Sequence, residues 1–440
     1  MKVQQLTLAN FRGFEQVDLK FEKDVTLIAG VNGIGKSGIL YALANLFSRL
    51  LPEFTPSTSK AMSFTDEDIC HNKQILDVSA QIAVADQICH CGIQRVLAND
   101  ESGDHWNQFW LSKKQSEAKN LSFAEMIKDR ILTGDLEAGR TENVKMLGRL
   151  KTRPKQPIAI LFSPRRHLPG RPKLLPKTEA FAIANAFGFA LHDREVELRE
   201  IMHWFRVVET GGSAAHKHGG IILDKLREVI TSFIPEFSNL HIEEKPNLRF
   251  MVEKNGTPLV LNQLSDGERG LLAMLFDITR RLSIANPDLD DPISEGAAII
   301  LIDEIELHLH PLWQRQVLRR FKEIFRNCQF IATTHSPLVI SEVEARCVRF
   351  LDRDGNGKIY ATIPSEAYGL DANRILEEYM GTRVRTQDID NRLGNLFELI
   401  DDEDFAAARK NIQELRIRLG ENDPELTRAS SLIKFLEGAE

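Results

Sequence analysis

The sequence is poor in cysteine and lacks any long apolar run. Its 440 residues include five cysteines, at positions 70, 89, 91, 328 and 347. So few thiols in a long chain predict reduced cysteines and a cytoplasmic protein rather than a disulfide-stabilised secreted one. No stretch approaches the roughly 18–20 apolar residues of a membrane helix, and Met1–Gln5 runs into an alternating pattern rather than a signal peptide. We therefore expect no membrane association.

The chain also lacks an excess of positive charge. Its net charge is −7, so nucleic acid would be bound only through a local patch. Residues 143–178 could supply one, because they contain no Asp or Glu but ten basic residues, at positions 145, 149, 151, 153, 155, 165, 166, 171, 173 and 177. Three interpretations stay open: a solvated face, contact of Arg165 or Arg166 with a bound nucleotide, or contact with nucleic acid.

Sustained heptads are absent as well, so the middle of the chain is expected to be a compact insertion and not a long coiled coil. The alternation of buried strands and amphipathic helices predicts an α/β fold with two lobes. The expected organisation is a first lobe at 1–100, a mostly helical insertion at 101–237, a second lobe at 238–370, and a helical docking or oligomerisation element at 371–440.

A phosphate-binding pattern lies near the N-terminus. Gly30-Val-Asn-Gly-Ile-Gly-Lys-Ser37 follows the apolar run Val25–Ala29 and opens an amphipathic helix, which is the P-loop arrangement. The glycines let backbone N–H groups converge on a phosphate, and the helix N-terminus adds positive partial charge. Lys36 is expected to bind the β- and γ-phosphates, and Ser37 a magnesium ion. The predicted nucleotide-binding residues of this loop are Asn32, Gly33, Gly35, Lys36 and Ser37.

A turn precedes the P-loop strand. Asn10-Phe-Arg-Gly-Phe14 joins two alternating runs that read as a strand pair. Arg12 lies within this turn. It is interpreted either as an ordinary surface residue or as a nucleotide contact.

A second candidate anion site is Leu264-Ser-Asp-Gly-Glu-Arg-Gly270, which opens another helix. Ser265 and Gly267 at a helix start suit a phosphate. The alternative is a plain helix cap in which Ser265 and Glu268 form a capping box.

Two further apolar runs end in polar residues. Ala297–Ile302 is expected to be a strand buried on both faces, and it ends in Asp303 and Glu304. Carboxylates there are costly unless they are used, and magnesium and water at a phosphate site are the evident use. Cys328–Thr334 is the next buried strand, and His335 follows it directly.

Taken in order, these motifs resemble the ABC-type ATPases of the SMC, Rad50 and RecF group. The run Asp303-Glu-Ile-Glu-Leu-His-Leu-His-Pro311 looks most like the PtuA-type ATPases of the Septu and retron anti-phage systems. The resemblance implies ATP and Mg²⁺ as cofactors. It also implies that Asp303 supports the metal, Glu304 activates water and His335 senses the γ-phosphate.

The resemblance also implies partners. Ser265, Gly267 and Glu268 would cap ATP bound to another subunit. Because the chain holds one P-loop and one such motif, this implies a head-to-tail homodimer or a higher oligomer. Residues 336–440 carry no convincing nuclease set, so any nuclease is expected to be a separate HNH-type subunit. The lid glutamine of the family is not evident, and Gln81 and the region around Arg165 are candidates.

Three functions follow from these features. The first is a regulatory ATPase of an anti-phage complex that controls the separate nuclease. The alternative is a RecF-like DNA-repair ATPase that binds DNA directly through residues 143–178. A third is a nucleotide-sensing scaffold with almost no turnover.

Overall fold

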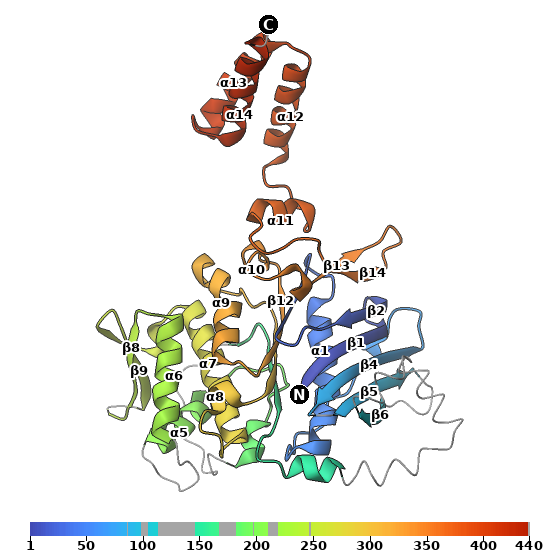
Figure 1. The fold of residues 1–440 in the computed structure, drawn as a ribbon, viewed down its shortest axis with the longest axis vertical. Coiled ribbons are helices and arrows are strands. Elements are labelled where there is room, and N and C mark those ends of the chain that lie inside the picture. Colours follow the sequence, from blue (N-terminus) through green and yellow to red (C-terminus); the bar gives the residue numbers. More distant parts are fainter. Residues whose placement is uncertain are drawn as a thin grey trace. The chain divides into compact units, whose positions relative to one another are not determined.

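The fold is described from a computed structural model of the chain. It describes residues 1–85, 87–97, 104–112, 146–166, 182–196, 198–209, 219–245 and 248–438. These form two compact units, Met1–Ala372 and Asn373–Glu440 (Figure 1). Each unit is treated in turn, beginning with the larger one.

The centre of the larger unit is a six-stranded sheet in the order β14-β13-β3-β12-β11-β7. The strands are β3 (Val25–Gly30), β7 (Ile158–Phe162), β11 (Ala298–Ile302), β12 (Gln329–Thr334), β13 (Val348–Arg353) and β14 (Ile359–Thr362). Neighbouring strands from β13 to β7 pair in parallel. Every residue of β3, β11 and β12 is buried. β11 is entirely apolar, as expected for a central parallel strand, whereas β3 contains Thr26 and β12 contains Gln329, Thr333 and Thr334.

A five-stranded antiparallel sheet lies beside it, in the order β2-β1-β4-β5-β6. Its strands are β1 (Lys2–Phe11), β2 (Phe14–Lys20), β4 (Ile75–Val84), β5 (Gln87–Val96) and β6 (Asp104–Ser112). Helix α1 (Lys36–Phe54) contacts strands of both sheets, and most of its residues are buried. It is therefore packed between them (Figure 1).

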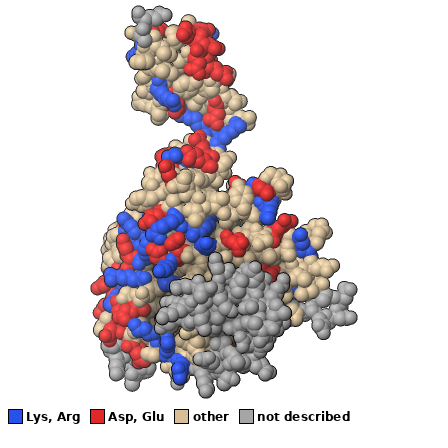
Figure 2. Space-filling model, turned by 45° about the vertical axis from the view of Figure 1, so that its right-hand side comes forward, with Lys and Arg blue, Asp and Glu red and all other residues tan. Residues whose placement is uncertain are grey.

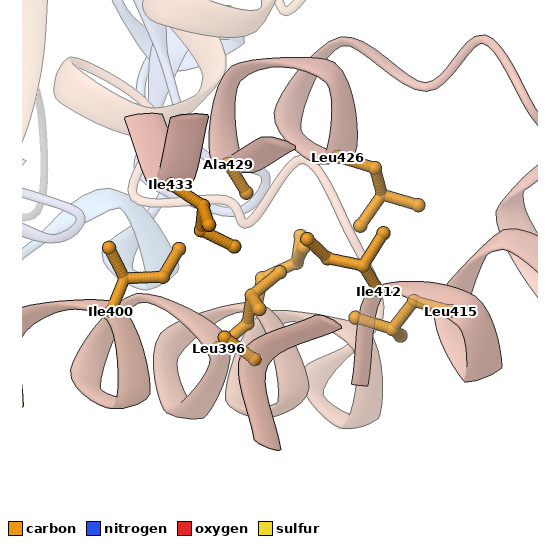
Figure 3. Packing of buried hydrophobic residues seen from close by; sticks show 9 residues of the cluster. Leu396, Ile400, Ile412, Leu415, Leu426, Ala429 and Ile433 are labelled. Carbon is orange, nitrogen blue, oxygen red and sulfur yellow. The ribbon is translucent and has the colours of Figure 1, made fainter. Parts of the chain in front are cut away.

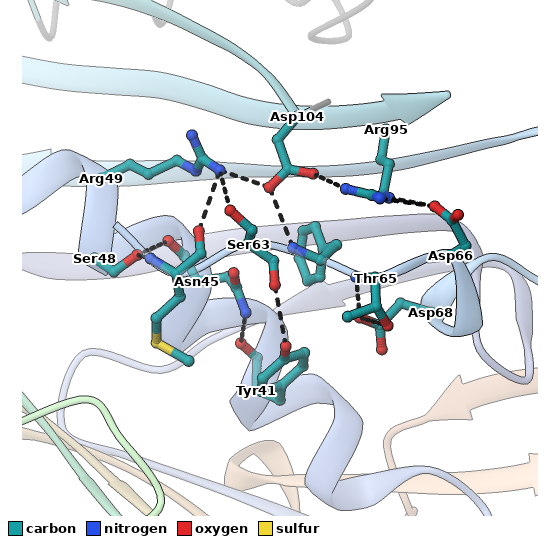
Figure 4. Close-up of polar contacts among 12 residues, drawn as sticks. Tyr41, Asn45, Ser48, Arg49, Ser63, Thr65, Asp66, Asp68, Arg95 and Asp104 are labelled. Carbon is teal, nitrogen blue, oxygen red and sulfur yellow. Dashed lines mark hydrogen bonds and ion pairs between the residues drawn. The ribbon is translucent and has the colours of Figure 1, made fainter. Parts of the chain in front are cut away.

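The buried carboxylate of Asp104 ties this sheet to α1. It accepts hydrogen bonds from Arg49 of α1 at 2.5 Å, from the backbone N–H of Phe64 at 3.1 Å and from Arg95 of β5 at 3.2 Å (Figure 4). Arg95 also pairs with Asp66 in the short 3₁₀ helix η1 (Asp66–Asp68). A charge this deeply buried is tolerated because its oxygens are satisfied by cationic and backbone donors.

Helices on the opposite side of the parallel sheet from α1 complete the unit (Figure 1). They are α5 (Leu198–Glu209), α6 (Gly219–Phe233), α7 (Asp266–Ala285), α8 (Pro292–Glu295), α9 (Pro311–Ile324) and α10 (Pro337–Ile340). The shorter elements are η2 (Ile183–Ala186), η3 (Leu261–Gln263), η4 (Ala345–Cys347) and the small sheet β8 (Phe237–Glu243), β9 (Arg249–Lys254) and β10 (Thr257–Val260). Pro311 is the first residue of α9, a position where proline is common, and the side chain of His310 caps the helix.

The smaller unit is helical. Its helices are α12 (Gln387–Asp401), α13 (Phe405–Leu419) and α14 (Pro424–Glu437), and α11 (Ala372–Glu378) spans the boundary. Leu396, Ile400, Ile412, Leu415 and Ile433 meet in a shared core (Figure 3). Asp404 and Asp423 cap the starts of α13 and α14, which fixes where these helices begin. None of the helices described is both long and apolar enough to cross a membrane.

The predicted α/β fold with a C-terminal helical extension is confirmed. The division between the units, at 372/373, falls close to the predicted boundary at 371. Two strands lie where a mostly helical insertion was predicted. β6 pairs with β5, and β7 pairs with β11 as the edge strand of the central sheet. Residues 113–145, 167–181 and 210–218 of that insertion lie outside the described residues.

Candidate nucleotide-binding site

Four parallel strands end at one edge of the central sheet. β3 leads into the P-loop, β12 into His335, β11 into Asp303 and Glu304, and β7 into Ser163–Arg166. These strands are neighbours in the order β3-β12-β11-β7. The carboxyl edge of a parallel sheet is where such folds bind ligands. The topology thus gathers the predicted P-loop, acidic and histidine residues from three distant parts of the sequence.

The P-loop has the backbone shape that phosphate binding requires. Gly33 and Gly35 have φ angles of 77° and 103°, in the left-handed region. A Cβ added at Gly35 would lie 2.7 Å from the ring of Phe14, so this position demands glycine. Asn32, Gly33 and Ser37 are exposed at the loop and the start of α1. The loop amides and the helix N-terminus are therefore open to an anion.

Lys36 lies folded against its own loop. Its side chain is buried, and Nζ donates to the carbonyl oxygens of Gly30 at 2.7 Å and Val31 at 3.0 Å. Burial lowers the pKa of Lys36, and the nearby carboxylates of Glu306, Asp303 and Glu304 act in the opposite direction. The ammonium group is thus held at the phosphate-binding loop beside three acidic side chains.

Asp303 and Glu304 form a tightly held turn after β11. The hydroxyl of Thr333 donates to Oδ1 of Asp303 at 2.5 Å and accepts the backbone N–H of Glu304 at 2.8 Å. Glu304 has a φ of 48°, which is unusual for a residue with a side chain. Glu304 is partly buried, whereas Asp303 is buried. A constrained backbone therefore carries a carboxylate residue that keeps some access to solvent.

These residues fit a magnesium nucleotide by their chemistry. Ser37 and Asp303 offer only oxygen atoms, which magnesium prefers as ligands. Lys36 and the loop amides offer positive charge and hydrogen-bond donors for phosphate oxygens. Ser37 lies in the first turn of α1, directly after Lys36, and the charge of Asp303 acts on that lysine.

Arg166 has a role that the sequence did not reveal. Its guanidinium is 4% exposed and donates to the backbone carbonyl oxygens of Asp303 and Glu304. Burial lowers the pKa of Arg166 to about 10, against the opposing effect of Glu306, Asp303 and Glu304. This side chain is committed to the turn that carries Glu304. Its neighbour Arg165 is exposed and lies 3.7 Å from Asp193.

Other basic residues of the 143–178 segment are only partly described. Lys155 lies 3.4 Å from Glu295 in an exposed ion pair. Figure 2 shows Lys and Arg interspersed with Asp and Glu on the face in view. Lys145, Arg171, Lys173 and Lys177 lie outside the described residues. A role of this segment in nucleic-acid binding therefore stays a prediction.

Glu306 also belongs to this site and was missed as a functional residue. Its buried carboxylate accepts the hydroxyl of Thr334 at 2.7 Å and the backbone N–H of His335 at 2.8 Å. Nε2 of His335 lies 3.4 Å from the same carboxylate. The Asp-Glu-x-Glu pattern after β11 was a sequence signal for Glu306. Its hydrogen-bond partners, Thr334 and His335, lie at the end of the next strand along the chain.

The 264–270 motif forms the start of α7. Ser265 caps the helix, and both oxygens of Glu268 are used: Oε2 accepts from the backbone N–H and hydroxyl of Ser265, and Oε1 accepts from Lys254 at 2.6 Å. A Cβ at Gly267 would lie 2.2 Å from the carbonyl oxygen of His308. Gly267 is thus required by close packing within the chain. The capping box accounts for Ser265 and Glu268, and their contact with a nucleotide stays a prediction.

Arg12 is anchored beside α1. Nε donates to Asp68 at 2.8 Å, and the guanidinium lies 4.6 Å from the ring centroid of Tyr41. Asp68 is itself held by the backbone N–H of Thr65 at 2.9 Å (Figure 4). The side chain of Arg12 remains 42% exposed, so it is positioned and still accessible for a nucleotide contact. Gln81, by contrast, lies within β4 of the antiparallel sheet.

Comparison with known proteins identifies the family of this chain. The family described as "AAA domain, putative AbiEii toxin, Type IV TA system" matches residues 25–341. The chain is 43% identical over 129 residues to the Retron Ec83 probable ATPase of Escherichia coli, covering 29% of this chain and 23% of that protein. It is 36% identical over 136 residues to the Septu protein PtuA of Bacillus thuringiensis, covering 30% of this chain and 34% of that protein. The resemblance to ABC-type ATPases of the Septu and retron group is confirmed.

The similarity covers only parts of these relatives, about a quarter of the retron ATPase and a third of the Septu protein. Among solved structures, the SMC head domain from Thermotoga maritima is 14% identical and has a TM-score of 0.42, covering 83% of this chain and 100% of that one. The SmcHead bound to the C-winged helix domain of ScpA has a TM-score of 0.45 at 15% identity, covering 82% and 97%.

Proposed function

This chain belongs to the family described as "AAA domain, putative AbiEii toxin, Type IV TA system", and from that premise we propose that it is the ATP-binding and ATP-hydrolysing regulatory subunit of an anti-phage defence complex. The observation that carries the proposal is the meeting of the P-loop, Asp303, Glu304 and His335 at one sheet edge. The sequence similarity to retron and Septu ATPases supports the defence context.

Each residue has a role in this proposal. Lys36 exchanges its contacts with Gly30 and Val31 for the β- and γ-phosphates, assisted by the loop amides of Asn32, Gly33 and Gly35. Bound magnesium supplies charge stabilisation at the phosphates. Ser37 and Asp303 would hold that ion.

The acidic turn then acts on water. Glu304 accepts a proton from the attacking water through its carboxylate, as general-base catalysis requires. His335 follows β12 beside the P-loop strand, where it contacts the γ-phosphate. ATP hydrolysis thus requires the side chains at the ends of three neighbouring strands.

The assembly is part of the same proposal. We assign Ser265 and Gly267 to the ATP of a second copy, so that closure of a head-to-tail homodimer, or of a larger oligomer built from it, depends on ATP. A separate HNH-type nuclease would bind this ATPase and be controlled by its nucleotide state. The helical unit at Asn373–Glu440 has its own core and is the candidate docking element.

A Glu304→Gln variant tests the hydrolytic function. It is expected to bind ATP and to turn it over about 10²–10⁴-fold more slowly, because the general base is lost. Phosphate release, binding of a fluorescent ATP analogue and mass by light scattering would be measured with magnesium present. Glu323→Gln on exposed α9 is the matched control. Equal turnover in Glu304→Gln and the control would refute the assignment of Glu304.

The alternative is a RecF-like ATPase that binds DNA directly, and the basic segment 143–178 is the observation in its favour. It predicts DNA affinity that falls steeply with salt in the absence of any partner. Fluorescence anisotropy with duplex DNA at two salt concentrations would test this. Replacing Arg149, Lys151 and Arg153 with Gln should abolish such binding. Absence of binding, together with co-purification of an HNH nuclease, would favour the regulatory function.

A further inference from the structure

We propose that Arg166 is a positioning residue for catalysis, which fixes the backbone on both sides of Glu304. The proposal rests on ATP hydrolysis as the proposed function. Glu304 has a φ of 48°, which places a residue with a side chain in the left-handed region. Such a conformation is unfavourable for a residue with a side chain and persists only where surrounding contacts enforce it.

Arg166 and Thr333 make four of those contacts, and the backbone N–H of Leu307 makes a fifth, to the carbonyl oxygen of Glu304 at 2.9 Å. In the peptide group before Glu304, the carbonyl oxygen of Asp303 accepts a hydrogen bond from Arg166. The N–H of Glu304 donates to the hydroxyl of Thr333 at 2.8 Å. In the peptide group after Glu304, the carbonyl oxygen of Glu304 accepts a hydrogen bond from Arg166. The N–H of Ile305 donates to the carbonyl oxygen of Thr333 at 3.0 Å. Both peptide groups that flank the catalytic carboxylate are therefore held at both ends.

Arginine suits this position better than lysine. The two carbonyl oxygens belong to successive residues, and one guanidinium bonds both with separate nitrogens, Nη1 to Asp303 and Nη2 to Glu304. A planar fork reaches two acceptors in a fixed geometry, whereas an ammonium group is a single point charge. The carbonyl oxygen of Ser163, 3.4 Å from Nη1, receives a third and weaker contact.

The position of Arg166 in the fold explains how it reaches the turn. It follows β7, which pairs in parallel with β11, and Phe162 lies opposite Ile302 in the register. The segments that follow β7 and β11 leave the sheet side by side, so the side chain of Arg166 reaches the turn at residues 303–304. Its burial excludes a direct role in binding a macromolecule in this conformation.

An Arg166→Met variant tests the proposal against the matched control Arg165→Met, whose side chain is exposed. Arg166→Met should lower kcat about tenfold to a hundredfold, since small misplacements of a catalytic group have effects of this size. Its affinity for a fluorescent ATP analogue should equal that of the wild type, because Lys36 and the P-loop are unchanged. Hydrogen exchange should become faster at the amides of 304–307, where Glu304 and Ile305 donate to Thr333 and Leu307 donates to the carbonyl oxygen of Glu304.

Arg166→Lys keeps the positive charge but removes the planar fork of the guanidinium. It also provides a test if Arg166→Met does not fold. Positioning by the fork predicts a kcat between those of wild type and Arg166→Met, with unchanged ATP affinity. Wild-type kcat in Arg166→Lys would overturn the proposal, because charge alone would then suffice. Equal kcat and exchange in Arg166→Met and Arg165→Met would also overturn it. If the wild type hydrolyses no ATP, the proposed function fails, and the exchange rates still decide whether Arg166 holds the turn.

Discussion

The backbone N–H of His335 donates to Oε1 of Glu306 at 2.8 Å, and Nε2 of the same histidine lies 3.4 Å from that oxygen. The other carboxylate oxygen accepts the hydroxyl of Thr334 at 2.7 Å. Glu306 therefore holds both the end of β12 and the imidazole ring that follows it. This joins the segment after β11 to the segment after β12 at the point where we place the γ-phosphate.

Glu306→Ala is expected to lower kcat. The change leaves the N–H of His335 and the hydroxyl of Thr334 without their acceptor, and losing a hydrogen bond to a charged group costs about 1.5–3 kcal/mol. If the full effect reaches the transition state, turnover falls roughly 10- to 150-fold. Steady-state phosphate release gives kcat and KM, and Glu342→Ala on the surface is the control. Wild-type kcat in a folded Glu306→Ala protein would contradict this role.

The sequence predicted the parts of the site that have local signals. The P-loop shows itself by glycine, lysine and serine spacing, and the strand before Asp303 by an unbroken apolar run. Arg166 had no such signal, because its function depends on strand order, and the Asp-Glu-x-Glu pattern that contains Glu306 does not by itself show that Thr334 and His335 are its partners. Arg166 bonds a carbonyl 137 residues further along the chain. Its strand β7 was assigned to the insertion because pairing with β11 is a tertiary event that periodicity does not encode.

Lys36→Ala is expected to weaken ATP binding by about 1.5–3 kcal/mol, which corresponds to roughly 10- to 150-fold in Kd. The reason is the loss of a charged donor to the phosphates. Titration with a fluorescent ATP analogue measures the change, and Lys23→Ala, at an exposed position, is the control. The free energy of unfolding without nucleotide should change less than the free energy of ATP binding. The reason is that Lys36 is a partly desolvated cation, and its burial lowers its pKa. Equal ATP affinity in both variants would exclude Lys36 from the phosphate site.

Asp277→Asn is expected to destabilise the larger unit. Asp277 is buried on α7 and bonds Arg281 at 2.9 Å, Arg194 at 2.9 Å and Arg280 at 3.1 Å. Burial alone would raise the pKa of Asp277, but the charges of these three arginines outweigh it and hold the pKa well below 3.8. Removing one partner of such a buried network costs about 3–5 kcal/mol. Urea unfolding at pH 7.5 measures this loss, with exposed Asp224→Asn as the control.

The same carboxylate gives a pH dependence with a defined sign. Because its folded-state pKa is depressed, its stabilising contribution is complete above the unfolded-state pKa near 4 and is lost as the pH falls below that value. The gap in unfolding free energy between wild type and Asp277→Asn should therefore stay constant from pH 7.5 to pH 5 and narrow at lower pH. A gap that widens on acidification would show that the ionised form is not the stabilising one.

Mixing two inactive variants tests whether the 264–270 motif acts on the ATP of another copy. Lys36→Ala disables the P-loop, and Ser265→Arg places a bulky side chain at the exposed start of α7. In a head-to-tail dimer of one chain of each kind, one site carries both substitutions and the other carries neither. Random pairing of equal amounts makes about half of the dimers mixed, so about a quarter of all sites are intact. We expect ATP hydrolysis to recover toward that fraction on mixing. If the motif serves the ATP of its own chain, every site keeps one substitution and the mixture stays inactive, as a mixture of two Lys36→Ala preparations would.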